Sequence, residues 1–168
     1  TISLPARMKS IKSIFGTFVQ TAQANQAASF GTSVFQNSNL TSYRFEIGSV
    51  RYPQSDVQIS AGNKAESTAE LHKAFGRLSD YSHSSCVRPK HLENIDTIRA
   101  PQDIHSCGLS GFVLGQSFES FRSEIENGID TQSRSLPVNF ICSKGATAGT
   151  TNCDMYVLAD VLYYINSD

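Results

Sequence analysis

The side chains with the most chemical potential gather between positions 83 and 107. His83, Cys86, His91, His105 and Cys107 offer imidazole and thiol groups, and a structural zinc ion binds four ligands of this kind. Their spacings, HxxC and then HxC, match no closed zinc module. We therefore expect scattered loop residues in this region and no bound metal.

Patterns for nucleophilic or acid–base catalysis are equally weak. A catalytic Ser or Cys needs an oriented base and a site for the oxyanion, and the segment 108–111 (GLSG) lacks the spacing of a GxSxG nucleophile elbow. The carboxylate pairs Glu124 with Glu126 and Asp154 with Asp160 suggest no acid–base geometry, and solvated or interface charges explain them more simply. We expect no enzyme, no catalytic residue and no cofactor.

A small basic cluster is formed by Arg7, Lys9 and Lys12. Such a cluster is either a phosphate contact or a solvated edge, and the chain as a whole has a net charge of −1 from 14 basic and 15 acidic residues. No overall field therefore attracts nucleic acid or anionic membrane. We favour the solvated edge and expect neither a specific nucleic acid nor a small-molecule ligand.

Length and composition favour one β-rich domain. The 168 residues suffice for a single core, and charged residues make up 17% of the chain against roughly 25% in typical soluble proteins. Depletion of charge also suits a surface that is partly hidden in an assembly. The first residues, Thr1 to Pro5, show no signal-peptide pattern, so we expect a protein made in the cell interior, with its four cysteines reduced.

Alternation of apolar and polar residues predicts strands around Gly48 and before Cys142. Tyr43, Phe45 and Ile47 alternate with polar residues, and a second apolar alternation follows at 136–142. Segment 8–19 fits a helical stripe and a strand face equally well, so periodicity leaves it open. Segments 20–40 and 79–107 lack any lasting period and are predicted to be long surface excursions.

One helix is predicted, over residues 64–78. Asn63 would cap its first turn, with Glu66 three residues later. Its apolar stripe consists of Leu71, Ala74, Phe75 and Leu78.

The closing segment, 154–165 (DMYVLADVLYYI), is predicted to be a strand with two unlike faces. One face is wholly apolar and should enter the core: Met155, Val157, Ala159, Val161, Tyr163 and Ile165. The other, which we call the mixed face, is too apolar for open solvent yet carries one charge: Tyr156, Leu158, Asp160, Leu162 and Tyr164. We interpret the mixed face as an interface with another domain or subunit, in which Asp160 would need a donor. The alternative is a central strand covered by a loop of its own chain.

Six phrases, in this order, resemble double jelly-roll major capsid proteins of polinton-like, adintovirus-like and virophage-like DNA viruses. Together they span nearly the whole chain, and none is a catalytic signature. They are LPARMKSIKSIF (4–15), YRFEIGSVRYP (43–53), AELHKAFGRLSDYSHSSC (69–86), FVLGQSFES (112–120), GIDTQSRSLPVNF (128–140) and YVLADVLYYINSD (156–168).

The resemblance implies that residues 1–168 form a single jelly-roll domain, the C-terminal of two in a longer capsid protein. Three copies of that protein would form a pseudo-hexagonal capsomer of an icosahedral virion, in contact with the first jelly roll and with minor capsid proteins. It favours strand over helix for 11–20. The all-β fold implied is an eight-stranded sandwich with one inserted helix, its strands laid out at 1–6, 11–19, 42–48, 50–59, 110–118, 125–132, 136–143 and 154–165.

Two rival functions share this fold class. One is a jelly-roll carbohydrate-binding or receptor-binding module, since the fold alone does not choose a function. A lectin-like site needs exposed aromatic residues, and Tyr81 is the one clear candidate in the long loops. The other is a cupin-like metalloenzyme, which needs His and carboxylate ligands on neighbouring strands, whereas the histidines here fall on the predicted helix and in one loop.

Overall fold

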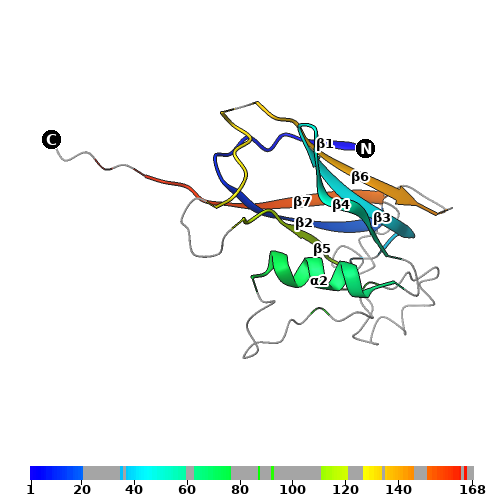
Figure 1. The fold of residues 1–168 in the computed structure, drawn as a ribbon. Coiled ribbons are helices and arrows are strands. Elements are labelled where there is room, and N and C mark those ends of the chain that lie inside the picture. Colours follow the sequence, from blue (N-terminus) through cyan, green and yellow to red (C-terminus); the bar gives the residue numbers. More distant parts are fainter. Residues whose placement is uncertain are drawn as a thin grey trace, which may run out of the picture.

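The computed structural model shows a mostly β protein with two antiparallel sheets and one helix (Figure 1). It describes residues 1–20, 35, 37–59, 63–76, 87, 92, 111–120, 127–133, 135–145, 151–163 and 165. The strands in this part of the chain are β1 (Ile2–Leu4), β2 (Ile11–Gln20), β3 (Leu40–Ile47), β4 (Val50–Gln58), β5 (Leu114–Ser117), β6 (Val138–Lys144) and β7 (Thr151–Ala159), and the helix is α2 (Ala65–Ala74).

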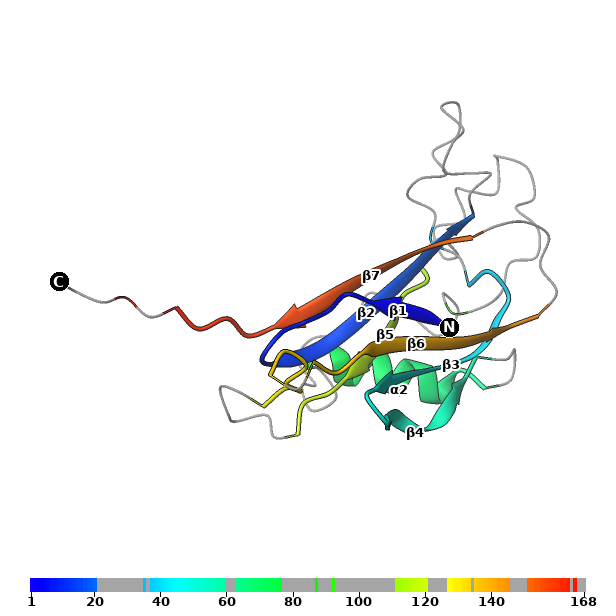
Figure 2. The same cartoon turned by 90° about the horizontal axis from the view of Figure 1, so that it is seen from above.

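The two sheets draw on segments far apart in the sequence. One sheet has the strand order β1-β6-β3-β4 and the other the order β5-β2-β7, and every pairing is antiparallel. Figure 2 shows β2 and β7 running side by side, with the chain leaving the body of the domain beyond β7. Among the described strands, only β3 and β4 form a hairpin of consecutive strands, with Gly48 in its turn at a positive φ of 62°.

Strand β3 shows how alternation builds this sheet. Tyr43, Phe45 and Ile47 are buried, whereas Arg44 between them is half-buried and its Nη1 donates to Asp56 of β4 at 2.9 Å. The apolar side of the strand therefore packs into the interior while the polar side forms ion pairs along the outside.

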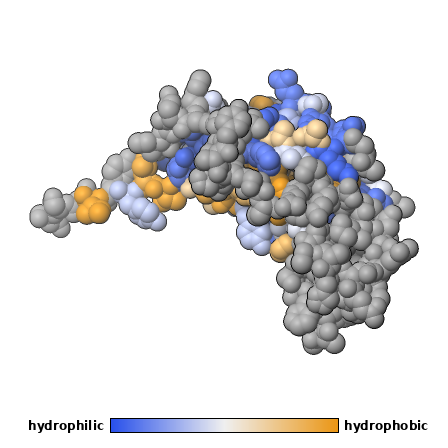
Figure 3. Space-filling view, turned by 90° about the horizontal axis from the view of Figure 1, so that it is seen from below, coloured by the Kyte–Doolittle hydropathy of each residue, from blue (hydrophilic) through white to orange (hydrophobic). Residues whose placement is uncertain are grey.

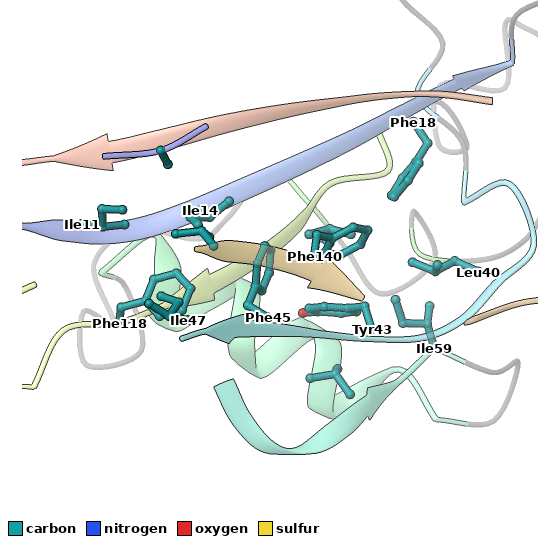
Figure 4. Close-up of a cluster of buried hydrophobic side chains, with 14 of the residues drawn as sticks. Ile11, Ile14, Phe18, Leu40, Tyr43, Phe45, Ile47, Ile59, Phe118 and Phe140 are labelled. Carbon is teal, nitrogen blue, oxygen red and sulfur yellow. The ribbon is translucent and has the colours of Figure 1, made fainter. Parts of the chain in front are cut away.

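The core lies between the sheets and combines aromatic rings with aliphatic side chains (Figure 4). The Phe140 ring lies 5.2 Å from that of Phe45 in the same sheet and 6.2 Å from that of Phe18 in the other sheet. The Tyr43 hydroxyl also reaches across and donates to the Gly115 carbonyl at 3.1 Å. Burial raises the pKa of Tyr43, so its hydroxyl stays protonated and can donate this hydrogen bond between the sheets.

Most of the predicted strands are confirmed, with shifted ends. The structure has strands at the predicted positions 11–19, 42–48, 50–59 and 136–143, and shorter strands within 1–6 and 110–118. The prediction for 125–132 is wrong for its described part, because there Ile129 forms only an isolated bridge with Ile11. The described residues thus contain seven strands, not eight.

The predicted helix exists but is shorter than 64–78. It begins after Lys64, which makes no capping bond through its side chain, so the predicted Asn63 cap is wrong. It ends at Ala74, just before Gly76 with a φ of 70°. Of the apolar stripe, Leu71 and Ala74 are buried against the outer side of Gly115, Phe75 is 41% exposed, and Leu78 lies outside the described residues.

Parts of the predicted surface excursions contribute to the interior. Leu40 is 2% exposed and Asn37 is 1% exposed, and the Asn37 amide donates to the Leu92 carbonyl at 2.8 Å. Leu92 belongs to the core cluster. The prediction of surface loops is therefore wrong at these three residues; most of the two segments lies outside the described residues.

Candidate assembly interface

Strand β7 has the two unlike faces that its sequence predicts. Met155 and Val157 are half-buried and pack against the core cluster. On the opposite side, Tyr156 is 56% exposed and Leu158 is 51% exposed. Among the described strands, β7 pairs with β2 alone, so it forms an edge of its sheet.

The predicted core face fails beyond Ala159. Ala159 is the last β7 residue with a partner, Ile11, and Ile11 is the first residue of β2. The described residues past this point, 161–163 and 165, form what we call the C-terminal extension. In the described part of the chain the extension has no neighbouring strand, and Val161, Tyr163 and Ile165 are 66%, 85% and 93% exposed. These apolar residues occur at every second position, as in a core strand, but they lie beyond the paired part of the sheet, where no strand buries them.

Leu162 of the mixed face is also open, with 49% of its surface exposed. Tyr164, the last predicted interface residue, lies outside the described residues. Apolar side chains are visible along the C-terminal extension at the left of Figure 3. The exposed apolar surface is thus larger than the sequence predicted, because it includes the extension as well as the mixed face.

Asp160 has its hydrogen-bond donors within its own chain. Ser10 Oγ donates to Asp160 Oδ2 at 3.0 Å, and Lys12 Nζ lies 3.0 Å from Oδ1. The backbone N–H of Asp160 donates to the Ser10 carbonyl at 3.0 Å. The donor that Asp160 was expected to need is therefore supplied by its own chain. We call Ser10, Lys12 and Asp160 the Asp160 cluster.

The Asp160 cluster is tied to two further segments. The Gly128 N–H donates to Ser10 Oγ at 3.1 Å, and Lys12 Nζ lies 3.7 Å from Glu119. The hydrogen bond to Asp160 raises the pKa of Lys12, so the ammonium stays charged. The cluster thus fastens the end of β7 to the start of β2, at the place where the extension begins.

The register of β2 and β7 continues the exposed apolar surface toward the helix. Phe15 pairs with Tyr156, so their side chains lie on the same side of the sheet. The Phe75 ring, just past the end of α2, stacks on Phe15 with 4.9 Å between centroids and is 41% exposed. An apolar row therefore runs from Phe75 across Phe15 to Tyr156, with Leu158 beside it.

The other candidate residues give no comparable site. Arg7 and Lys9 of the basic cluster are exposed, while Lys12 pairs with acidic side chains. The candidates His83, Cys86, His91, His105 and Cys107 lie outside the described residues, as do Glu124 and Glu126.

The two described cysteines, Cys142 and Cys153, are free and half-buried. Burial raises the pKa of both thiols, that of Cys153 to about 11. Thiols held in this state are poor nucleophiles near neutral pH.

Within the part of the chain that the structure describes, no group of three or more His, Cys, Asp or Glu side chains is placed to hold a metal ion. The same residues include no helix with the length and hydropathy to span a membrane. No family model matches the chain, and no curated protein or solved structure matches it either. Any function must therefore be argued from the fold and its exposed surface.

Sequence reasoning missed both the Asp160 cluster and the exposed extension. Ser10 and Asp160 are 150 positions apart, so no local pattern links them. The sole signal for Lys12 was its membership of the basic cluster. For the extension, the signal was the absence of any charged residue between Asp160 and Asp168.

Proposed function

We propose that the chain is a jelly-roll domain of a viral major capsid protein, with a structural and not a catalytic role, which assembles with copies of itself into trimeric, pseudo-hexagonal capsomers. The observation that carries the proposal is the exposed apolar surface at Tyr156, Leu158 and Leu162, which are each about half exposed. Apolar surface of this kind, gathered on one edge strand and its extension, is typical of a site that another protein covers.

The jelly-roll part of the proposal is supported by nested strand pairing. A jelly roll has eight strands in two sheets, formed when a long antiparallel hairpin rolls up. Here β3 pairs with β4, β2 with β5 and β1 with β6, so that each pair encloses the one before it along the chain. The pairings β3 with β6 and β2 with β7 join the strands into two sheets.

The charge of the exposed surface also supports self-association. Asp160 is neutralised within the chain by Lys12, so a partner that covers Leu158 need not supply a cation. Each half-exposed Leu, if fully covered, would contribute roughly 1 kcal/mol, about half of the value for burying a whole side chain. Since the same surface recurs in every copy of a symmetric assembly, several such contributions add up in each capsomer.

The test is Leu158→Arg, which places a charge in the covered surface. Val50→Arg is the matched control, because Val50 is also 51% exposed but lies at the start of β4 in the other sheet. We expect Leu158→Arg to lower the yield of trimers and particles at least tenfold, with the melting temperature of the domain unchanged, and Val50→Arg to leave both unchanged.

Equal particle yield from both variants would contradict the proposal. A trimer-free protein that instead binds glycans or a receptor through its loops would support the rival function, a jelly-roll binding module.

A further inference from the structure

The C-terminal extension exposes apolar side chains at successive positions. Val161, Tyr163 and Ile165 are the three most exposed large apolar side chains among the described residues, and Leu162 between them is about half exposed. The sequence holds no charged residue from 161 to 167. A segment with this much exposed apolar surface is stabilised when another apolar surface covers it.

The extension is directed away from the apolar row of its own copy. It continues past the end of β7 and leaves the body of the domain (Figure 2), whereas Tyr156 lies within the paired part of that strand. Folding back would need a chain reversal, and segment 161–165 (VLYYI) contains none of the residues that favour turns. Asp160, at the base of the extension, has both its side chain and its N–H hydrogen-bonded to Ser10. The extension is therefore not placed to cover the row beside it.

The apolar row matches the extension in length and in character. Phe15 and Tyr156 lie on the same side of neighbouring strands, and the rings of Phe15 and Phe75 are 4.9 Å apart. With paired residues roughly 5 Å apart, the row measures about 10 Å between its outer members. At roughly 3.3 Å per residue, Val161 to Ile165 spans about 13 Å. The extension is thus long enough to lie across the whole row.

A second copy of the chain supplies the complement, because every copy exposes both the extension and the row. Neither surface contains a charged side chain, so their contact would desolvate no charge within it. Tyr163, in the middle of the extension, would add a third ring to the stacked pair of Phe15 and Phe75.

We propose that the C-terminal extension of one copy docks on the apolar row of a second copy, with Tyr163 against Phe15 and Phe75. This inference rests on the self-association in the proposed function, and it names the segment that makes the contact. Because the extension and the row are different surfaces, the contact is head-to-tail, and three copies joined in this way form a closed ring.

The experiment replaces Tyr163 with the photoreactive amino acid benzoylphenylalanine in the otherwise unchanged 168-residue chain. The protein is irradiated at high concentration, and the products are separated under denaturing conditions. We expect a product with the mass of two chains. Peptide mapping of this product should join position 163 of one chain to Phe15, Phe75 or Tyr156 of the other.

Tyr156→Asp and Val50→Asp, each added to the photoreactive protein, form a matched pair. The two side chains are 56% and 51% exposed, but Val50 lies in the other sheet. Tyr156→Asp should lower the yield of the joined product about tenfold or more, because docking would have to desolvate the new charge. Val50→Asp should leave the yield unchanged. Ile165→Asp should also lower it, at a side chain too exposed to affect the folded body.

A cross-link within a single chain would overturn the inference, since the extension would then contact its own copy. A joined product that maps to another surface, or the absence of any joined product, would overturn it too. Sedimentation measures trimer formation separately. Trimers whose extensions map elsewhere would leave the assembly proposal standing, whereas joined pairs without trimers would support the docking of the extension and contradict the trimeric capsomer.

Discussion

Replacing Asp160 with alanine removes the acceptor that Ser10 and Lys12 share at the end of β7. Ser10 is 2% exposed, so its hydroxyl would lose a charged acceptor in a place that water hardly reaches. Lys12 would keep only the longer contact, 3.7 Å, with Glu119. The predicted result is a less stable domain, because the cluster holds β7 and β2 together where their ladder ends.

The expected loss of stability follows from the two side-chain contacts of Asp160, with Ser10 and with Lys12. A hydrogen bond to a charged group contributes roughly 1.5–3 kcal/mol, and we take the lower end because the Asp160 side chain is 24% exposed. The partly exposed ion pair with Lys12 adds up to about 0.5 kcal/mol. Asp160→Ala should therefore cost about 2 kcal/mol, which for a domain of this size lowers Tm by roughly 4–8 °C.

The assay is urea unfolding of Asp160→Ala, Ser10→Ala and the double variant. The two single changes should not be additive, because they remove the same contact. Asp154→Ala is the matched control, an exposed aspartate on β7, and should change stability by less than about 0.5 kcal/mol. If Asp160→Ala cost no more than Asp154→Ala, the cluster would not stabilise the end of β7 and the reasoning would be refuted.

Three further predictions concern the core and its charge states. Phe140→Ala should cost about 3–5 kcal/mol in urea unfolding, because the ring is fully buried between the sheets; a cost below 1 kcal/mol would contradict this packing. Gly128→Ala should cost at least about 2 kcal/mol of stability, because a Cβ at this position would lie 2.5 Å from the Ile11 carbonyl oxygen. Gly76→Ala is the comparison, because a Cβ at Gly76 would have no atom within 4 Å. It should cost roughly 1–2 kcal/mol, from its positive φ alone. The pKa of Cys153 is raised to about 11 by burial, so folding favours the neutral thiol. Stability should be full below the ordinary pKa of about 8.5 and should fall as the pH rises toward 11, and this fall should be smaller in Cys153→Ala.

Strand β3, which has a neighbour on each side, could be predicted from the sequence. In β3, the alternation of Tyr43, Phe45 and Ile47 reflects a face that is buried along its whole length. In the closing segment, the same kind of alternation continues past Ala159, although the ladder with β2 ends there. Periodicity indicates which face a side chain occupies, but it does not indicate whether a neighbouring strand is present to bury it.

The candidate site could be predicted only in part, for a related reason. Tyr156 and Leu158 could be identified because the alternation that predicts them lies within a single strand. The partners of Asp160 come from the start of the chain, and only the paired strands bring them together. The end of the helix at Ala74 was also missed, because Phe75 continues the apolar stripe but stacks on Phe15 from outside the helix.

The central proposal, assembly through the exposed surface of β7, is tested most directly by electron cryomicroscopy of the particles or capsomers that the full-length protein forms. The proposal predicts a three-fold capsomer of hexagonal outline in which Tyr156 and Leu158 are buried against another jelly roll. A protein that stays monomeric at high concentration, or a capsomer in which this surface faces solvent, would contradict it.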